Sequence, residues 1–366
     1  MKRKHLIQLF IGIVISAVAL YFVFRGVTLP DLWDSFKKVE YIWLLPCLLT
    51  FYFGIWVRAV RWKYLFKPDY DIPLRRSTAG MFICFAFNSV FPARVGEFAR
   101  AYLIGKKENT GFSTAFGTVV AERLLDSLVL LGALFLALLI APIDLTEDFT
   151  QEVLGRSVTM TPEKFASYKS KLFILTVIMA IGIALVAIPF TRRLSLKIMH
   201  TMTFIPQKLR DIVESLVENF AQGLQAFSSP GRSAWLVGLT MLAWCCNFWS
   251  AQILAAGFPF ENSVSFLDAL TITVVVAIFI TIPAAPGYWG FYEAGVLVSI
   301  TMLLGIHPEG GAIVLAYAIL LHLTQWLPIT LIGLPWAWVS HVSLEDAGKV
   351  EEKKTDEGVF GKKEKS

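Results

Sequence analysis

Two groups of charged residues interrupt a chain that is otherwise strongly apolar. They are Arg94, Glu97 and Arg100, and then Glu122, Arg123 and Asp126. A charged group at the centre of a membrane helix costs roughly 2.5–3.5 kcal/mol, so three unpaired groups would cost about 8 kcal/mol. Ionisable residues inside a membrane usually face a bundle interior or an aqueous cavity. The function is therefore expected at these two groups.

The second group has helical spacing. Glu122 and Asp126 share one helix face, and Arg123 can reach Asp126 three residues on. On a helix that enters the membrane near residue 112, these groups lie roughly 15–20 Å from its start. When fully paired they would form a structural clamp, and an excess carboxylate would hold a proton or a headgroup.

The first group has the same spacing on the returning arm of an expected hairpin. This places Arg94 or Arg100 opposite Glu122 or Asp126. The planar guanidinium of arginine binds phosphate through two parallel hydrogen bonds. A cavity with several arginines balanced by carboxylates suits a phosphate-bearing headgroup, and a purely structural network is the alternative.

A second constellation lies in the C-terminal half. Glu293 follows a break marked by Pro286, Gly287 and Gly290, and His322 stands on the last apolar run. A lone histidine in a span is either a packing residue or a proton relay.

Composition defines the elements that must position these residues. Of 366 residues, 56% are hydrophobic and only 17% charged, and the mean hydropathy is +0.62; soluble domains carry about 25% charged residues. Several apolar runs are long enough to cross a hydrocarbon core of about 30 Å. The sequence predicts an all-α polytopic membrane protein with six to eight transmembrane helices and one or two re-entrant broken-helix hairpins.

Spans are expected at 6–24, 41–57, 112–140, 171–190, 233–257 and 312–335. Residues 78–100 form an expected hairpin from the cytoplasm, broken by Pro92 and Gly96, because basic residues flank it on both sides. Arg58 and Arg61 are interpreted as the cytoplasmic end of the second span. Residues 264–282 and 287–306 are either two crossings or a second hairpin.

The remaining segments complete a membrane domain over 1–340. Residues 206–227 have the apolar periodicity of an amphipathic cytoplasmic helix, and 341–366 read as a charged disordered tail. Basic residues at the span ends place the N-terminus, and with weaker support the C-terminus, in the cytoplasm. The net charge of +5 follows this distribution, so no nucleic-acid partner is expected.

The order of a span, a broken segment and a long polar helix occurs twice, with an offset of about 190 residues. Hairpins that enter from opposite sides would make the halves inverted repeats, as in secondary transporters. Chance similarity between apolar stretches is the alternative.

The sequence contains few of the motifs that are typical of enzymes. The chain has no Gly-rich phosphate loop, no paired histidines with metal spacing and no G-x-S-x-G. We expect no enzyme activity, no cofactor and no metal.

The motifs together resemble the lysylphosphatidylglycerol synthase transmembrane, or flippase-like, family. They are Asn88, Pro92-Ala93-Arg94-Val95-Gly96-Glu97 with Arg100, Thr118-Val119 with Glu122-Arg123 and Asp126, and Pro286-Gly287 with Gly290 and Glu293. The resemblance covers most of residues 5–340 and does not include an aminoacyl-transferring domain. Where many members have an arginine on the last span, this chain has His322.

The resemblance implies translocation of a phosphate-bearing lipid, of the aminoacylated phospholipid or polyprenyl-phosphate type, across the cytoplasmic membrane. The expected substrate-binding residues are Asn88, Arg94, Glu97, Arg100, Glu122, Arg123, Asp126, Glu293 and His322. Two alternatives remain, a membrane-embedded transferase that uses a lipid-linked donor and a non-transporting membrane partner. The sequence leaves the lipid, the driving ion and the oligomeric state open.

Overall fold

A computed structural model describes residues 3–91, 94–140, 149–153, 156–160, 229–260, 263–281, 286–300 and 311–340, with isolated residues between 161 and 197. The helices are α1 (Arg3–Phe24), α2 (Leu29–Lys37), α3 (Leu44–Leu65), α4 (Leu74–Val90), α5 (Val95–Lys107), α6 (Phe112–Ile140), α10 (Pro230–Ala255), α11 (Phe266–Phe279), α12 (Phe291–Val298) and α13 (Ala312–Val339). Short 3-10 turns, η1 (Tyr41–Trp43) and η3 (Pro286–Tyr288), precede α3 and α12. The predicted all-α membrane fold is confirmed, with one small addition. Strands β1 (Phe149–Val153) and β2 (Arg156–Met160) pair as an antiparallel hairpin.

Three of the described helices, α3 with η1, α10 and α13, are long and apolar enough to cross a membrane. Helices α1 and α2, bent by 74° at their junction, add a fourth span if they are counted as one. Helix α6 has 29 residues, but Glu122, Arg123 and Asp126 interrupt its apolar sequence. The predicted total of six to eight spans stays a prediction.

Several predictions fall outside the described residues. They are most of the span at 171–190, the amphipathic helix at 206–227, the tail at 341–366 and the break at Pro92.

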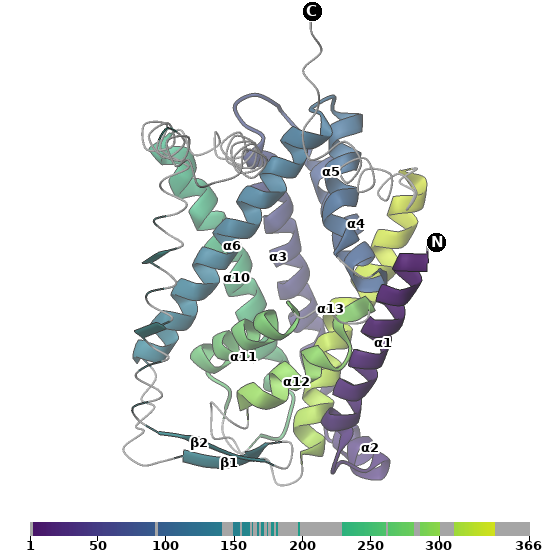
Figure 1. The fold of residues 1–366 in the computed structure, drawn as a ribbon, viewed down its shortest axis with the longest axis vertical. Coiled ribbons are helices and arrows are strands. Elements are labelled where there is room, and N and C mark those ends of the chain that lie inside the picture. The colour runs from purple at the N-terminus through teal and green to yellow at the C-terminus, as the bar shows by residue number, and fades with distance from the viewer. Residues whose placement is uncertain are drawn as a thin grey trace, which may run out of the picture.

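The chain order gives the two halves opposite directions (Figure 1). Helix α3 runs from the end that carries α2 toward the opposite end, and α10, packed beside it, runs back. Helices α6 and α13 are also opposed in direction. The hairpin α4–α5 occupies one half of the molecule, whereas α11 and α12 occupy the other half. This is the arrangement that the expected inverted repeats require.

The described part of the second broken segment consists of two short helices, and this favours the hairpin over two crossings. Helix α11 has 14 residues, a length of about 21 Å that does not cross a core of about 30 Å. A capping box between Ser265 and Asp268 fixes its start. Gly287 within η3 and Gly290 at the N-cap of α12 have positive φ angles of 78° and 89°, which glycine adopts readily.

One prediction about the first half is wrong in detail. Gly96 does not break a helix, because it is the second residue of α5 and lies buried against α4. A Cβ on Gly96 would lie 1.9 Å from the Cys84 carbonyl oxygen, so the glycine permits the two arms to pack closely. The break itself lies just before α5, where Arg94 has φ 54°.

A short helix was also missed between the first two expected spans. Helix α2 begins at the N-cap Thr28, whose hydroxyl accepts the Asp31 N–H, and Pro30 stands in its first turn.

Beyond α3, Lys67 and Lys63 hold the pKa of the exposed Asp71 carboxyl below its usual value by hydrogen bonding and charge.

Candidate functional site

A closed network of four charged side chains lies between α3, α5 and α6. Arg61 places Nη1 2.6 Å from Asp126 Oδ1 and Nη2 3.2 Å from Glu122 Oε1. Arg100 meets Glu122 with two parallel hydrogen bonds of 3.1 and 3.2 Å. We call Arg61, Arg100, Glu122 and Asp126 the inner quartet. Its two positive and two negative charges balance, as a buried network requires.

Uncharged groups complete the inner quartet from α3 and α10. Thr240 accepts a hydrogen bond from Arg61 Nη1 at 3.0 Å, and Trp244 Nε1 donates to Asp126 Oδ1 at 3.1 Å. The guanidinium of Arg100 lies over the Trp62 ring, 4.8 Å from its centroid. The predicted contact between Arg100 and Glu122 is therefore present, and it is a fully buried one.

The interpretation of Arg58 and Arg61 as a membrane boundary was wrong. Helix α3 continues to Leu65, and the side chains of Arg58 and Arg61 are 5% and 0% exposed. Their one visible signal was helical spacing, which puts both on the face that also carries the buried Trp62.

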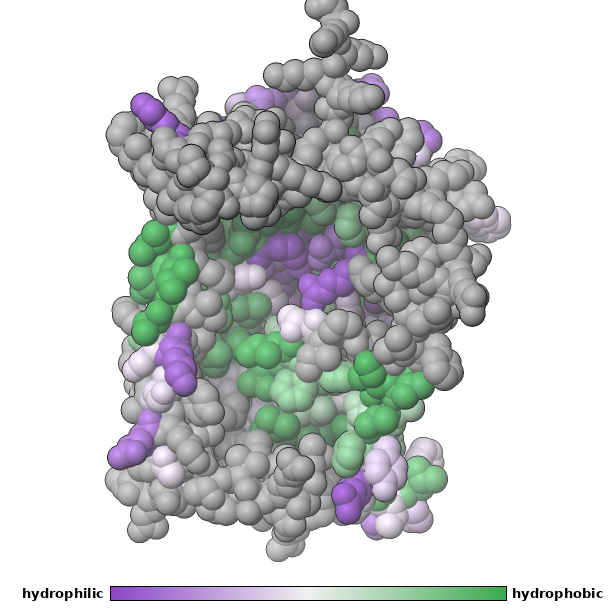
Figure 2. Space-filling view, viewed as in Figure 1, coloured by the Kyte–Doolittle hydropathy of each residue, from purple (hydrophilic) through white to green (hydrophobic). Residues whose placement is uncertain are grey.

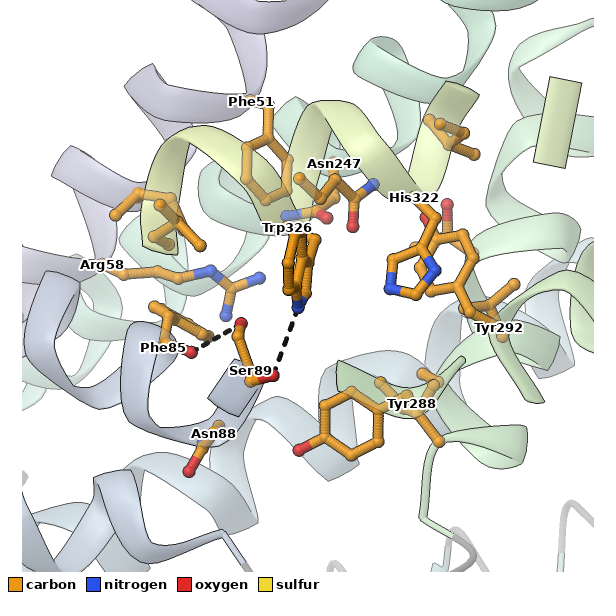
Figure 3. Close-up of a pocket in the computed structure, with 18 of the residues that line it drawn as sticks. Phe51, Arg58, Phe85, Asn88, Ser89, Asn247, Tyr288, Tyr292, His322 and Trp326 are labelled. Atoms are coloured by element: carbon orange, nitrogen blue, oxygen red, sulfur yellow. Dashed lines mark hydrogen bonds between the residues drawn. The ribbon is translucent and has the colours of Figure 1, made fainter. Parts of the chain in front are cut away.

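A cavity of about 210 Å³ lies next to the inner quartet and separates the two halves. Its charged wall consists of Arg58, Arg94, Glu97 and Arg123, which we call the outer set. Figure 3 shows Arg58 approaching from one side and His322 from the other, with Trp326 between them in this view. Apolar residues such as Ile55, Val276 and Ile280 complete the wall.

The predicted site residues divide into two classes. Asn88, Arg94, Glu97, Arg123 and His322 line the cavity. Four predicted residues do not line it: Arg100, Glu122, Asp126 and Glu293. The cavity residue Arg123 contacts Glu122 and Asp126, and His322 contacts Glu293. Arg100 is bonded to Glu122. The sequence prediction missed Arg58, Trp244, Asn247, Tyr288 and Trp326 in the wall.

Within the outer set, Arg58 and Arg94 are loosely paired compared with the inner quartet. Arg123 Nε lies 3.8 Å from Glu97 Oε1, and Arg58 Nη1 lies 3.6 Å from Asp126 Oδ2. Arg94 donates one 3.4 Å hydrogen bond to the Ile280 carbonyl. Arg123 is held more closely on its other side, with Nη2 2.5 Å from Glu122 Oε1 and 3.4 Å from Asp126 Oδ2. The long contacts of Arg58 and Arg94 leave most of their five N–H donors available to a ligand.

The two helix breaks meet at the cavity. Trp326 Nε1 donates to the Ser89 carbonyl at 3.2 Å, which joins α13 to the end of α4. Gly287 lies against both groups, since a Cβ there would be 2.8 Å from Trp326 Nε1 and 3.1 Å from the Ser89 oxygen. Asn88 Oδ1 accepts the Gly96 N–H at 2.9 Å and so fixes the start of α5.

The second half contributes a closed acid–histidine pair. Glu293 Oε1 lies 2.7 Å from His322 Nδ1, and Glu293 Oε2 accepts the Gly290 N–H at 2.7 Å. The imidazole stacks on Tyr292 with centroids 4.3 Å apart. Glu293 is fully buried, so the pair presents only His322 to the cavity.

Within the described part of the chain, no cluster of three or more His, Cys, Asp or Glu side chains could hold a metal ion. The polar groups that line the cavity include three guanidinium groups and the indole N–H groups of Trp244 and Trp326, with Glu97 as the one carboxylate among its described lining residues. This arrangement is suited to an anion.

Comparison with known proteins agrees with this membrane architecture. A family model described as "Lysylphosphatidylglycerol synthase TM region" matches residues 9–333. The chain is 26% identical over 305 residues to a protein named "Glycosyltransferase AglD" from Haloferax volcanii, covering 79% of this chain and 47% of that protein. It is also similar to two proteins named "UPF0104 membrane protein". The one from Methanothermobacter thermautotrophicus is 26% identical, covering 35% of this chain and 37% of that protein. The one from Pyrococcus horikoshii is 23% identical, covering 81% of this chain and 87% of that protein.

The chain thus spans about half or less of the length of the first two relatives. No solved structure matches it.

Proposed function

The chain belongs to the family described as the lysylphosphatidylglycerol synthase TM region, and from this premise we propose that it transports a phosphate-bearing lipid between the leaflets of the cytoplasmic membrane. In this proposal it is a transporter and not an enzyme. The observation that carries the proposal is the cavity between the α4–α5 hairpin and helices α11 and α12, with three arginines in its wall. Substrate sites of inverted-repeat transporters lie at broken helices near the membrane midplane.

The headgroup would occupy the cavity while its hydrocarbon chains stay in lipid. Arg94 and Arg123, named from the sequence, would contact the phosphate together with Arg58. Asn88 and Glu97 would orient these groups, and the inner quartet would hold α3, α5 and α6 in register. Figure 2 shows a hollowed face with hydrophilic residues at depth and hydrophobic residues beside them.

Transport also requires the site to open alternately to each side. Two polar contacts hold the segments together at the breaks, Trp326 Nε1 to the Ser89 carbonyl at 3.2 Å and Arg94 to the Ile280 carbonyl at 3.4 Å. In our proposal these contacts close one route and are exchanged when the hairpins move. The cytoplasmic side is assigned to the end that bears Lys67, Arg75 and Arg76, by the positive-inside rule. The C-terminal end of α13 lies at that same end.

A flipping assay tests the proposal. The purified protein would be reconstituted in liposomes that contain fluorescent phosphatidylglycerol or a fluorescent polyprenyl phosphate. An impermeant quencher would then measure the fraction of the fluorescent lipid in the outer leaflet. We expect the double variant Arg94→Gln/Arg123→Gln to flip lipid at least about tenfold more slowly, which corresponds to a barrier higher by about 1.4 kcal/mol.

Arg75→Gln is the matched control, because Arg75 is exposed at the start of α4 and outside the cavity. Thermal unfolding of all samples would separate lost flipping from lost folding. Flipping by the folded double variant at the rate of Arg75→Gln would refute the proposal.

The glycosyltransferase name of one relative favours a second candidate, a membrane-embedded transferase that uses a lipid-linked donor. Product formation by the purified chain, with no change in leaflet distribution, would support that candidate over transport.

A further inference from the structure

The charged groups around the cavity do not cancel. Among the described residues of the inner quartet and the outer set, five arginines face three carboxylates, which leaves two positive charges. The arginines are Arg58, Arg61, Arg94, Arg100 and Arg123, and the carboxylates are Glu97, Glu122 and Asp126.

The excess lies on the cavity wall. The inner quartet is neutral, and each of its carboxylate oxygens is bonded to a guanidinium of Arg61 or Arg100. The outer set has three arginines against Glu97, all of which line the cavity. The Glu293–His322 pair lies on the opposite wall, where Glu293 is buried and bonded at 2.7 Å to His322, so it is not counted with these groups.

The donors on that wall are also in excess. Arg58 makes no hydrogen bond to another described residue, and it contacts only Asp126 at 3.6 Å and the Trp244 ring. Arg123 gives one hydrogen bond, from Nη2 to Glu122 at 2.5 Å, although Nη2 also lies near Asp126. Buried charges and donors that the protein does not satisfy are costly. An occupant that supplies two negative charges and several acceptor oxygens would remove that cost.

We propose that the cavity selects a headgroup with two negative charges, the terminal phosphomonoester of a lipid, over a singly charged phosphodiester. This inference rests on the proposed function for its assumption that the occupant is a lipid. A phosphomonoester carries about −1.5 to −2 charge near neutral pH and has three strong acceptor oxygens. A phosphodiester carries one charge, which would leave one excess positive charge unmatched.

Free phosphate has the same charge and acceptor oxygens as a phosphomonoester headgroup, and the apolar part of the cavity wall favours the lipid. Apolar residues, among them Phe51, Ile55 and Val276, share the wall with the arginines. The hollow of Figure 2 likewise combines hydrophilic residues with hydrophobic ones at the same opening. A soluble ion would gain nothing from that apolar part, whereas the first carbons of a lipid chain would.

Lipid retention in nanodiscs tests the inference without any transport step. The protein would be placed in phosphatidylcholine nanodiscs containing either phosphatidic acid, a phosphomonoester, or phosphatidylglycerol, a phosphodiester, at about pH 7.5. Native mass spectrometry would count retained lipids. We expect about tenfold preference for phosphatidic acid, equal to 1.4 kcal/mol.

Variants that change the charge by one unit sharpen the test. Arg94→Gln, which leaves one excess charge, is expected to abolish or invert the preference, and Arg75→Gln is expected to preserve it. Equal retention of the two lipids by the native protein, or a preference that Arg94→Gln leaves intact, would overturn the inference. Inorganic phosphate that displaces phosphatidic acid at equal concentration would overturn the lipid assignment.

The outcomes stay separable from the transport proposal. A charge preference without flipping would refute transport and leave this inference standing. Flipping without a charge preference would do the reverse.

Discussion

The two broken halves of the molecule place a carboxylate at the same position and use it differently. Glu97 is the third residue of α5, and Glu293 is the third residue of α12. The chain separation between them equals that between Asp126 and His322, which stand on the long helices that follow. Glu97 is 17% exposed with one 3.8 Å ion pair, whereas Glu293 is 1% exposed with both oxygens bonded at 2.7 Å.

The difference assigns separate roles to the halves. The first half leaves charges and donors facing the cavity, as a ligand site needs. The second half closes its carboxylate on a helix start and a histidine, and so holds the opposite wall in place. In the inverted-repeat hypothesis, corresponding positions have therefore diverged into a binding wall and a supporting wall.

The largest expected effect would come from the inner quartet, to which we assign a structural role. Glu122→Gln leaves Arg61 and Arg100 with a buried unmatched charge, and breaking a buried pair costs roughly 3–5 kcal/mol. Thermal or denaturant unfolding in detergent would measure this loss. The control Asp69→Asn removes an exposed carboxylate outside the network. Equal stability of the two variants would mean that the inner quartet is not structural.

Close packing of the first hairpin gives the next effect. In Gly96→Ala the new Cβ must move away from the Cys84 carbonyl, 1.9 Å away, and overpacking of this kind costs about 1–3 kcal/mol or more. Gly238→Ala, in α10 with no atom within 4 Å of its Cβ, is the matched control. Unfolding measurements should separate the two variants. A Gly96→Ala protein as stable as the control would contradict the observed contact between α4 and α5.

The smallest effect tests the comparison itself. Glu293→Gln weakens two buried hydrogen bonds and should cost about 1–3 kcal/mol of stability. Glu97→Gln removes a long, partly exposed ion pair and should cost less than about 1 kcal/mol. Flipping should show the opposite order, since Glu97 lines the cavity and Glu293 does not. Similar stability losses in both variants would remove the proposed distinction between the halves.

The sequence was sufficient for the elements that depend on local patterns. The expected helix at 112–140 is α6 (Phe112–Ile140), because a long apolar run marks both of its ends. The expected segments at 233–257 and 312–335 lie within a few residues of α10 and α13. Helix α2 was missed because it is short and amphipathic, without the long apolar run that marks a span.

The site could be predicted only in part, since its geometry depends on contacts between distant segments. Charges at the end of an apolar run normally mark a membrane surface, so Arg58 and Arg61 were assigned there, although Asp126 lies opposite them in the fold. Glycine after proline normally indicates a break, yet Gly96 serves close packing against Cys84. Neither the partner of a charge nor the atom next to a glycine can be deduced from local spacing.

The most direct test of the central claim is a cryo-EM map of the protein in nanodiscs that contain a phosphomonoester lipid. We predict headgroup density in the cavity, with phosphate oxygens about 2.7–2.9 Å from guanidinium nitrogens of Arg58, Arg94 and Arg123. A map in which the lipid headgroup lies elsewhere, while the three arginines pair only with protein carboxylates, would contradict it.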